Sequence, residues 1–309
     1  MYNGILNVYK EAGYTSHDVV AKLRGICKQK KIGHTGTLDP EAVGVLPVCF
    51  GSGTKLCDLL TDWDKEYIAV LRLGLTTDTQ DISGQVLSKA DEEVLAHLDE
   101  GQVRESILHF LGGYEQIPPM YSALKVNGKK LYELARAGKE VDRKPRPVTI
   151  SELEILEFAL PLVRFRVVCS KGTYIRTLCH DIGERLLVGG VMESLTRSRV
   201  GIFSIDGALT LTEIEKLRDE DKIASVIISP DAVLADLRAV TAAGNAKRLL
   251  QNGNRIPEAM FAQVMPLKDG EEVRMYDEKD LFYGIYQYQS RSRDARPVKM
   301  FLPEDSLRK

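Results

Sequence analysis

Between residues 33 and 44 the chain reads Gly33-His34-Thr35-Gly36-Thr37-Leu38-Asp39-Pro40-Glu41-Ala42-Val43-Gly44, a glycine-framed stretch with a single aspartate near its centre. Glycine permits tight backbone turns, and Pro40 disfavours a helical conformation at the residue before it. The stretch therefore predicts a shaped loop that aims the Asp39 carboxylate. The spacing alone also fits an ordinary turn in which Asp39 bonds to its own backbone. A phosphate-binding loop is a weaker interpretation, because the lysine of a Walker loop is missing.

The glycine-framed stretch continues as Val45-Leu46-Pro47-Val48-Cys49-Phe50-Gly51. Together the two segments resemble the signature loop of the TruB-type tRNA pseudouridine synthases, and the match is long and specific. In that family the aspartate is the catalytic residue, so the resemblance implies this role for Asp39. It also makes His34 the candidate for contacting the displaced RNA.

A second motif starts at Lys65, which opens a run of alternating and β-branched residues that ends at Gly74 and predicts a strand. Tyr67 lies near the beginning of this strand, where an aromatic residue half buried in the core would fit equally well. Lys-x-Tyr at this point resembles the family's second motif, in which the tyrosine ring stacks on the target base and its hydroxyl acts in proton transfer. The resemblance therefore implies that Tyr67 is a catalytic residue.

A third motif follows the alternating segment from Leu162 to Cys169, which predicts a strand, and a helix is expected to begin near Thr173. Arg176 falls in the first turn, where a positive charge is unfavourable for the helix dipole, so an anion is expected to compensate it. A surface salt bridge would suffice. The segment resembles the family's third motif, in which this arginine pairs with the catalytic aspartate and Tyr174 lines the base pocket. The family's last motif implies that Leu195 forms an apolar wall of the pocket.

Basic residues are unevenly distributed in the 309-residue chain, although its net charge is −2. Residues 123–146 contain eight basic and three acidic side chains. A solvated surface and an RNA-facing patch fit this excess equally. The segment from Gln116 to Tyr132 also resembles a TruB-family block, which implies an insertion over the RNA stem-loop and makes Lys125 a substrate-binding candidate. Within it, Asn127-Gly128 predicts a tight turn.

Metal and membrane sites are not expected. The cysteines and histidines form no ligand-spaced set, which favours reduced thiols. Asp78 to Gly84 lacks the ligand alternation of a calcium loop and is interpreted as a turn between strands. The apolar runs are too short to span a membrane, and the N-terminus lacks a signal-peptide pattern. We expect a cytoplasmic monomer that uses no metal or other cofactor.

The order of predicted elements indicates a mixed fold. A strand over residues 3–9 precedes a helix that Ser16 caps, and further helices are expected at 211–216 and 224–237. The resemblance implies an α+β fold for residues 1–240, a pseudouridine-synthase-like mixed sheet flanked by helices. Residues 241–309 resemble a small, β-rich PUA-like RNA-binding domain, although a ligand-free β cap would have the same pattern.

The motifs occur in the family's order over almost the entire first 240 residues. The resemblance implies that the protein binds the T stem-loop of tRNA, flips out uridine-55 and isomerises it to pseudouridine. An adjacent Arg176 is expected to lower the pKa of Asp39 by about 1 to 3 units. Two alternatives are a pseudouridine synthase that acts on another RNA and a non-catalytic RNA-binding or folding protein.

Overall fold

The structure is a computed structural model that describes residues 1–126 and 128–302. The main body of the protein is built on a nine-stranded mixed sheet. Its strands, in spatial order, are β1 (Gly4–Lys10), β3 (Val43–Phe50), β12 (Gly190–Val200), β4 (Lys65–Leu73), β11 (Leu162–Cys169), β10 (Arg146–Ala159) and β7 (Gly112–Gln116). The short strands β2 (Ile32–His34) and β13 (Phe203–Ser204) pair with β3 and β12. Because β12 runs parallel to β3 and antiparallel to β4, the predicted mixed sheet is confirmed.

Side-chain alternation determines which face of β4 is buried. Every second residue from Lys65 to Leu73 is buried and the residues between them are half-buried, as the period of two in a strand requires when one face packs on a core. Tyr67 belongs to the buried set. The neighbouring strand β11 has the bounds that its alternation predicts.

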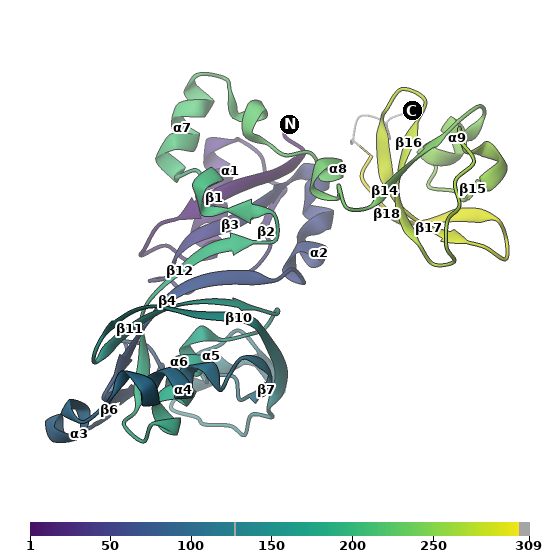
Figure 1. The fold of residues 1–309 in the computed structure, drawn as a ribbon. Coiled ribbons are helices and arrows are strands. Elements are labelled where there is room, and N and C mark those ends of the chain that lie inside the picture. The colour runs from purple at the N-terminus through teal and green to yellow at the C-terminus, as the bar shows by residue number, and fades with distance from the viewer. Residues whose placement is uncertain (127, 303–309) are drawn as a thin grey trace.

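Helices flank both halves of the sheet (Figure 1). They are α1 (Ser16–Ile26), α2 (Cys57–Thr61), α3 (Glu92–Ala96), α4 (Glu100–Leu108), α5 (Leu131–Arg136), α6 (Ile175–Arg185) and α7 (Leu211–Asp219). Helices α1 and α7 share a hydrophobic cluster with β1 and β3, whereas α4 and α6 share another with β4 and β11. In the described residues, no helix is long and apolar enough to cross a membrane.

Two small hairpins project from the chain between the main strands. The first pairs β5 (Leu75–Thr77) with β6 (Val86–Lys89), and the second pairs β8 (Lys125–Val126) with β9 (Lys129–Lys130). Gly128 has a φ of +81°, which suits a tight turn. Its predicted turn partner Asn127 lies outside the described residues.

Two helix predictions are wrong in detail. Thr15 rather than Ser16 caps α1, since the N–H of Asp18 donates to Thr15 Oγ1 at 3.1 Å. The helix expected at 224–237 is replaced by a 3₁₀ turn (Ile223–Val226) and the short helix α8 (Pro230–Val233). The physical reason is the proline, which lacks a backbone N–H and disfavours a helical conformation at the residue before it.

The C-terminal part of the chain forms a second, five-stranded sheet. Its strands, in spatial order, are β14 (Arg238–Ala242), β16 (Glu272–Asp277), β17 (Phe282–Gln289), β18 (Asp294–Met300) and β15 (Ile256–Pro257), and α9 (Ala246–Gln251) packs against this sheet. The domain lies beyond α8 in Figure 1. Because β14 belongs to this sheet, the sheet begins before the boundary predicted at residue 240. Ile285 and Phe301 share a hydrophobic cluster with Ile5 and Val45 of the main sheet, so the two domains are packed together.

Gly183 in α6 tests how tightly this helix packs. A Cβ at Gly183 would lie 2.1 Å from the backbone nitrogen of Gly190 in β12. Gly183→Ala must therefore move α6 away from β12, and we expect the free energy of unfolding to fall by about 1 to 3 kcal/mol in chemical denaturation.

The matched control is Gly25 in α1, where a Cβ would meet nothing within 4 Å. Gly25→Ala should leave stability unchanged or raise it by up to about 1 kcal/mol, because alanine favours helices. Equal effects of the two substitutions would contradict the close contact between α6 and β12.

Candidate active site

The loop at residues 35–42, between β2 and β3, carries Asp39 and is held from two directions. Lys10 Nζ donates to the carbonyl oxygen of Pro40 at 2.8 Å, and the N–H of Gly13 donates to the same oxygen at 3.0 Å. On the other side, the N–H of Leu38 donates to Ser16 Oγ at 2.9 Å. Lys10 and Ser16 are fully buried. The end of β1 and the start of α1 therefore fix the backbone on both sides of Asp39.

Arg176 meets Asp39 through two contacts. Arg176 Nε lies 2.9 Å from Asp39 Oδ2, and Nη2 donates to Oδ1 at 3.2 Å. The arginine side chain is 6% exposed and that of Asp39 is 38% exposed. A two-pronged contact of this kind fixes the direction of a carboxylate. The arginine lies in the first turn of α6, as predicted, and the helix begins at Ile175.

Two further segments contact Arg176, and the sequence analysis predicted neither of these contacts. Nη1 donates to the carbonyl of Thr79 at 3.0 Å and lies 3.7 Å from Asp81 Oδ2. Nη2 donates to the carbonyl of Tyr121 at 2.8 Å. The segment containing Thr79 and Asp81 joins β5 to β6, as predicted, but its sequence indicates only a turn. A backbone carbonyl leaves no mark in the sequence, so these contacts are visible only in the folded protein.

The pKa of Asp39 is raised above its ordinary value. The protein packed around the carboxylate removes water from it, and this effect outweighs the opposing attraction of Arg176. Asp81 adds a second negative charge and raises the pKa further. The Asp39 side chain is 38% exposed, but the protein packed around the carboxylate still removes much of the water that would hydrate its charge. The expectation of a lowered pKa is therefore wrong, because desolvation exceeds the charge attraction.

Tyr67 and Leu195 lie on adjacent strands, β4 and β12, and each is 8% exposed. Both belong to the hydrophobic cluster that includes Leu38 of the Asp39 loop. Arg197 is the partner of Tyr67 across these strands, and its Nε donates to the carbonyl of Val45 at 2.7 Å. The sequence analysis missed Arg197. The available signal was strand alternation, which places it on the same face as Leu195.

Tyr174 immediately precedes α6 and is held by one glutamine. Its N–H donates to Gln116 Oε1 at 2.8 Å, and its carbonyl accepts from Gln116 Nε2 at 3.0 Å. These two bonds join the end of β7 to the start of the helix that carries Arg176. The Tyr174 side chain is half-buried.

His34 and Lys125 have different surroundings. His34 ends β2, and its Nδ1 accepts the N–H of Gly36 at 3.3 Å. Burial lowers the pKa of His34, so the neutral imidazole predominates at neutral pH. Lys125 is exposed in β8. In the described part of the chain, Lys125 is not among the residues that contact Asp39 or Arg176.

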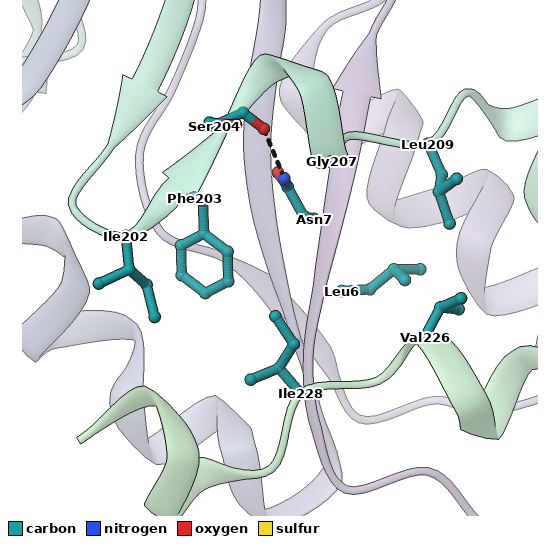
Figure 2. Close-up of a pocket in the computed structure, with 9 residues that line it drawn as sticks. All are labelled: Leu6, Asn7, Ile202, Phe203, Ser204, Gly207, Leu209, Val226 and Ile228. Carbon is teal, nitrogen blue, oxygen red and sulfur yellow. Dashed lines mark hydrogen bonds between the residues drawn. The ribbon is translucent and has the colours of Figure 1, made fainter. Parts of the chain in front are cut away.

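A hollow whose lining contains no ionisable side chain lies along β1 (Figure 2). It has a volume of about 360 Å³ and is lined by Leu6, Asn7, Ile202, Phe203, Ser204, Gly207, Leu209, Val226 and Ile228. None of these side chains exchanges a proton at neutral pH, so the hollow is no candidate for acid–base chemistry. Over residues 1–126 and 128–302, no three His, Cys, Asp or Glu side chains are grouped to hold a metal ion.

The residues around Asp39 support one kind of chemistry. An ionised carboxylate can attack an electrophilic carbon or stabilise positive charge on it. Arg176 fixes the direction of this carboxylate. Tyr67, which shares a hydrophobic cluster with Leu38 of the Asp39 loop, supplies a flat ring and a hydroxyl. A planar base brought out of a nucleic-acid stack can be held by such a ring.

The chain matches two protein-family models. Residues 24–175 match the N-terminal domain of TruB family pseudouridylate synthases, and residues 176–235 match the tRNA pseudouridylate synthase B C-terminal domain. A tRNA pseudouridine synthase B of Lachnoclostridium phytofermentans is 51% identical, over 97% of this chain and 100% of that protein. The protein of the same name from Alkaliphilus oremlandii is 46% identical, over 96% of this chain and 97% of that protein.

Two solved structures have a similar fold. A Cbf5-Nop10-Gar1 complex contains a chain that is 28% identical, with a TM-score of 0.73 over 99% of this chain and 87% of that chain. An H/ACA RNP bound to a substrate RNA containing 2′-deoxyuridine contains one that is 26% identical, with a TM-score of 0.72 over 98% and 86%. Since the family models cover most of the sequence and the relatives match it almost from end to end, the chain belongs to the TruB family of pseudouridylate synthases.

Proposed function

We propose that this enzyme converts uridine-55 in the T arm of tRNA to pseudouridine, with Asp39 as the catalytic carboxylate. The observation that carries the proposal is the two-pronged contact between Asp39 and Arg176, at the position where the family has its catalytic aspartate. The name shared by the relatives, tRNA pseudouridine synthase B, supports tRNA as the substrate.

Pseudouridine formation breaks the bond between uracil N1 and sugar C1′ and rejoins the same base through C5. Asp39 either attacks C1′ or stabilises the positive charge there while a proton leaves C2′. Both routes require an ionised carboxylate. Arg176 supports this state, because its charge opposes the rise in the pKa of Asp39 that burial causes.

Tyr67, Tyr174 and Leu195 are proposed to hold the extruded uracil. Flipping a nucleotide out of its stack costs a few kcal/mol, and stacking on an aromatic ring offsets part of this cost. Tyr67 supplies that ring and a hydroxyl for proton transfer, and Leu195 from the same hydrophobic cluster supplies an apolar wall. Tyr174 lines the pocket beside Arg176.

The basic segment at residues 123–146 is proposed to contact the T stem-loop. Six of its basic side chains are exposed: Lys125, Lys129, Arg136, Lys139, Lys144 and Arg146. The segment follows Tyr121, whose carbonyl accepts a hydrogen bond from Arg176, so these positive charges are on a chain segment anchored at the site. Lys125 would bind phosphate, and His34 would contact the displaced RNA strand.

The β-rich domain from about residue 241 onward is proposed to be a PUA-like RNA-binding domain. Its hydrophobic contacts with Ile5 and Val45 give it a defined position relative to the main sheet. A second RNA contact at a fixed distance from Asp39 would select a folded tRNA by its shape. We propose that the enzyme acts as a cytoplasmic monomer.

Asp39→Asn tests the proposed reaction. We expect single-turnover conversion of uridine-55 by the wild-type protein on an unmodified tRNA transcript, and none by the variant, because an amide cannot supply the carboxylate charge. A binding assay must find the variant still bound to RNA. A transcript with cytidine at position 55 is the control for the site, since conversion elsewhere would indicate a different target.

Arg176→Lys tests the two-pronged contact. A point charge cannot reproduce the guanidinium fork, so we expect the single-turnover rate to fall by about 100-fold or more. Arg72→Lys is the matched control, because Arg72 makes the same kind of two-pronged contact with Glu193, at 2.6 and 3.0 Å. Arg72 lies at the end of β4 that is far from Tyr67. Similar losses in both variants would remove the special role of Arg176.

The pH dependence of the single-turnover rate tests the protonation state. A raised pKa means that Asp39 takes up a proton at a higher pH than an ordinary aspartate does. Activity should therefore be lost, as the pH falls, with a midpoint above the ordinary aspartate value of about 3.9. An acid midpoint at or below that value in a folded enzyme would contradict the dominance of burial over Arg176.

A further inference from the structure

Arg197 is a buried arginine without a carboxylate partner in the described residues. It is 1% exposed. Its Nε donates to the carbonyl of Val45 at 2.7 Å, and Nη2 donates to the carbonyl of Gly36 at 3.4 Å. Arginine does not lose its proton in proteins, and a buried charge is costly unless an opposite charge accompanies it. A negative charge that forms near Arg197 during the reaction would therefore compensate its buried positive charge.

Tyr67 is the side chain that faces Arg197. The two residues are partners in the antiparallel pairing of β4 with β12, so their side chains share one face of the sheet, with Cβ atoms about 4.5 to 5.5 Å apart. Burial raises the pKa of Tyr67, and the positive charge of Arg197 opposes this rise. The other ionisable groups facing Tyr67, Asp39 and Cys169, raise its pKa further. Arg197 is thus the neighbour that favours the phenolate.

We propose that Arg197 is a positioning residue that orients the Tyr67 hydroxyl and stabilises the phenolate formed when Tyr67 gives up its proton. This inference rests on the proposed function, in which Tyr67 acts in proton transfer. In the proposed arrangement Arg197 donates an N–H to the phenol oxygen, so the O–H hydrogen is free to point toward the bound base.

Tyr67 would transfer protons in the adduct that forms when uracil rejoins the sugar through C5. In that adduct C5 still carries its hydrogen, and N1 carries none. Tyr67 gives its proton to N1, and the O–H electron pair stays on the phenolate oxygen beside Arg197. The phenolate then removes the proton from C5. The C–H electron pair becomes the C5=C6 double bond, and the π pair of the N1=C6 double bond, which the adduct holds, returns to N1. The phenol is restored, and pseudouridine is the product.

A purely structural role for Arg197 must be distinguished, because its bonds to the carbonyls of Val45 and Gly36 also tie β3 to the Asp39 loop. The test therefore measures the ionisation of the residue at position 67 directly. The full-length protein is made with 3,5-difluorotyrosine at position 67 alone, since ring fluorines lower the phenol pKa into the range where the protein remains folded. Its ionisation is then followed by ¹⁹F NMR as the pH is raised.

We expect Arg197→Met to raise the pKa of this residue by about 1 to 2 pH units, because a nearby opposite charge is removed. The matched control is Arg199→Met, which removes an arginine from the same strand. Arg199 is 38% exposed and pairs with Glu66 at 3.4 Å, so its removal should leave the titration unchanged. With natural tyrosine, Arg197→Met should slow single-turnover pseudouridine formation by about 10- to 100-fold, and it should cause no further loss when Tyr67→Phe is already present.

An unchanged titration in folded Arg197→Met, or an equal loss of rate in the presence and absence of the Tyr67 hydroxyl, would overturn the inference. If Arg197→Met does not fold, Arg197→Lys replaces it. That variant keeps a charge without the guanidinium fork, and it should give a smaller rise in pKa and about a 10-fold loss of rate. Wild-type values for both would again overturn the inference. If the wild-type enzyme forms no pseudouridine in tRNA, the proposed function fails, while the titration still decides whether Arg197 stabilises the phenolate.

Discussion

The buried charge of Arg176 is the constraint on which the site depends. A guanidinium that is removed from water needs acceptors on all sides, and removing one partner of a buried pair leaves an uncompensated charge. The acceptors come from Asp39, Thr79 and Tyr121, which lie 137, 97 and 55 residues from Arg176 in the sequence. The contacts that aim the carboxylate therefore also join distant segments of the fold.

Opposing effects set the protonation of both acidic groups in the site. Burial favours the uncharged forms of Asp39 and Tyr67, and a neighbouring arginine opposes it in each case. Burial also lowers the pKa of Lys10, which anchors the Asp39 loop, to about 8. The site is thus a water-depleted region in which charged forms are stabilised by fixed neighbours. Such preorganised charges act more strongly there than they would in water.

Net charge is a poor guide to the partner of this protein. The chain carries a net charge of −2, yet its basic side chains are concentrated in one exposed segment that follows Tyr121. Electrostatic attraction to RNA depends on such local distribution, because charges further apart than about 10 Å are largely screened at 0.1 M salt. The packing of the C-terminal domain against the main sheet gives that domain a defined place relative to the site.

The sequence by itself determined the strands, loops and helix positions that follow from local residue patterns. The alternation in β4 and β11, the loop at Asp39 and the first-turn position of Arg176 follow from the sequence, and the family motifs supplied the Asp39 to Arg176 pairing that neither element indicates alone. Thr15, and not the predicted Ser16, caps α1, because the buried Ser16 hydroxyl accepts the N–H of Leu38 instead. Tertiary structure alone decided the carbonyl acceptors of Arg176, the pairing that sets Arg197 opposite Tyr67 and the direction of the shift in the Asp39 pKa. These depend on the sum of protein packed around a group, and no local pattern records that sum.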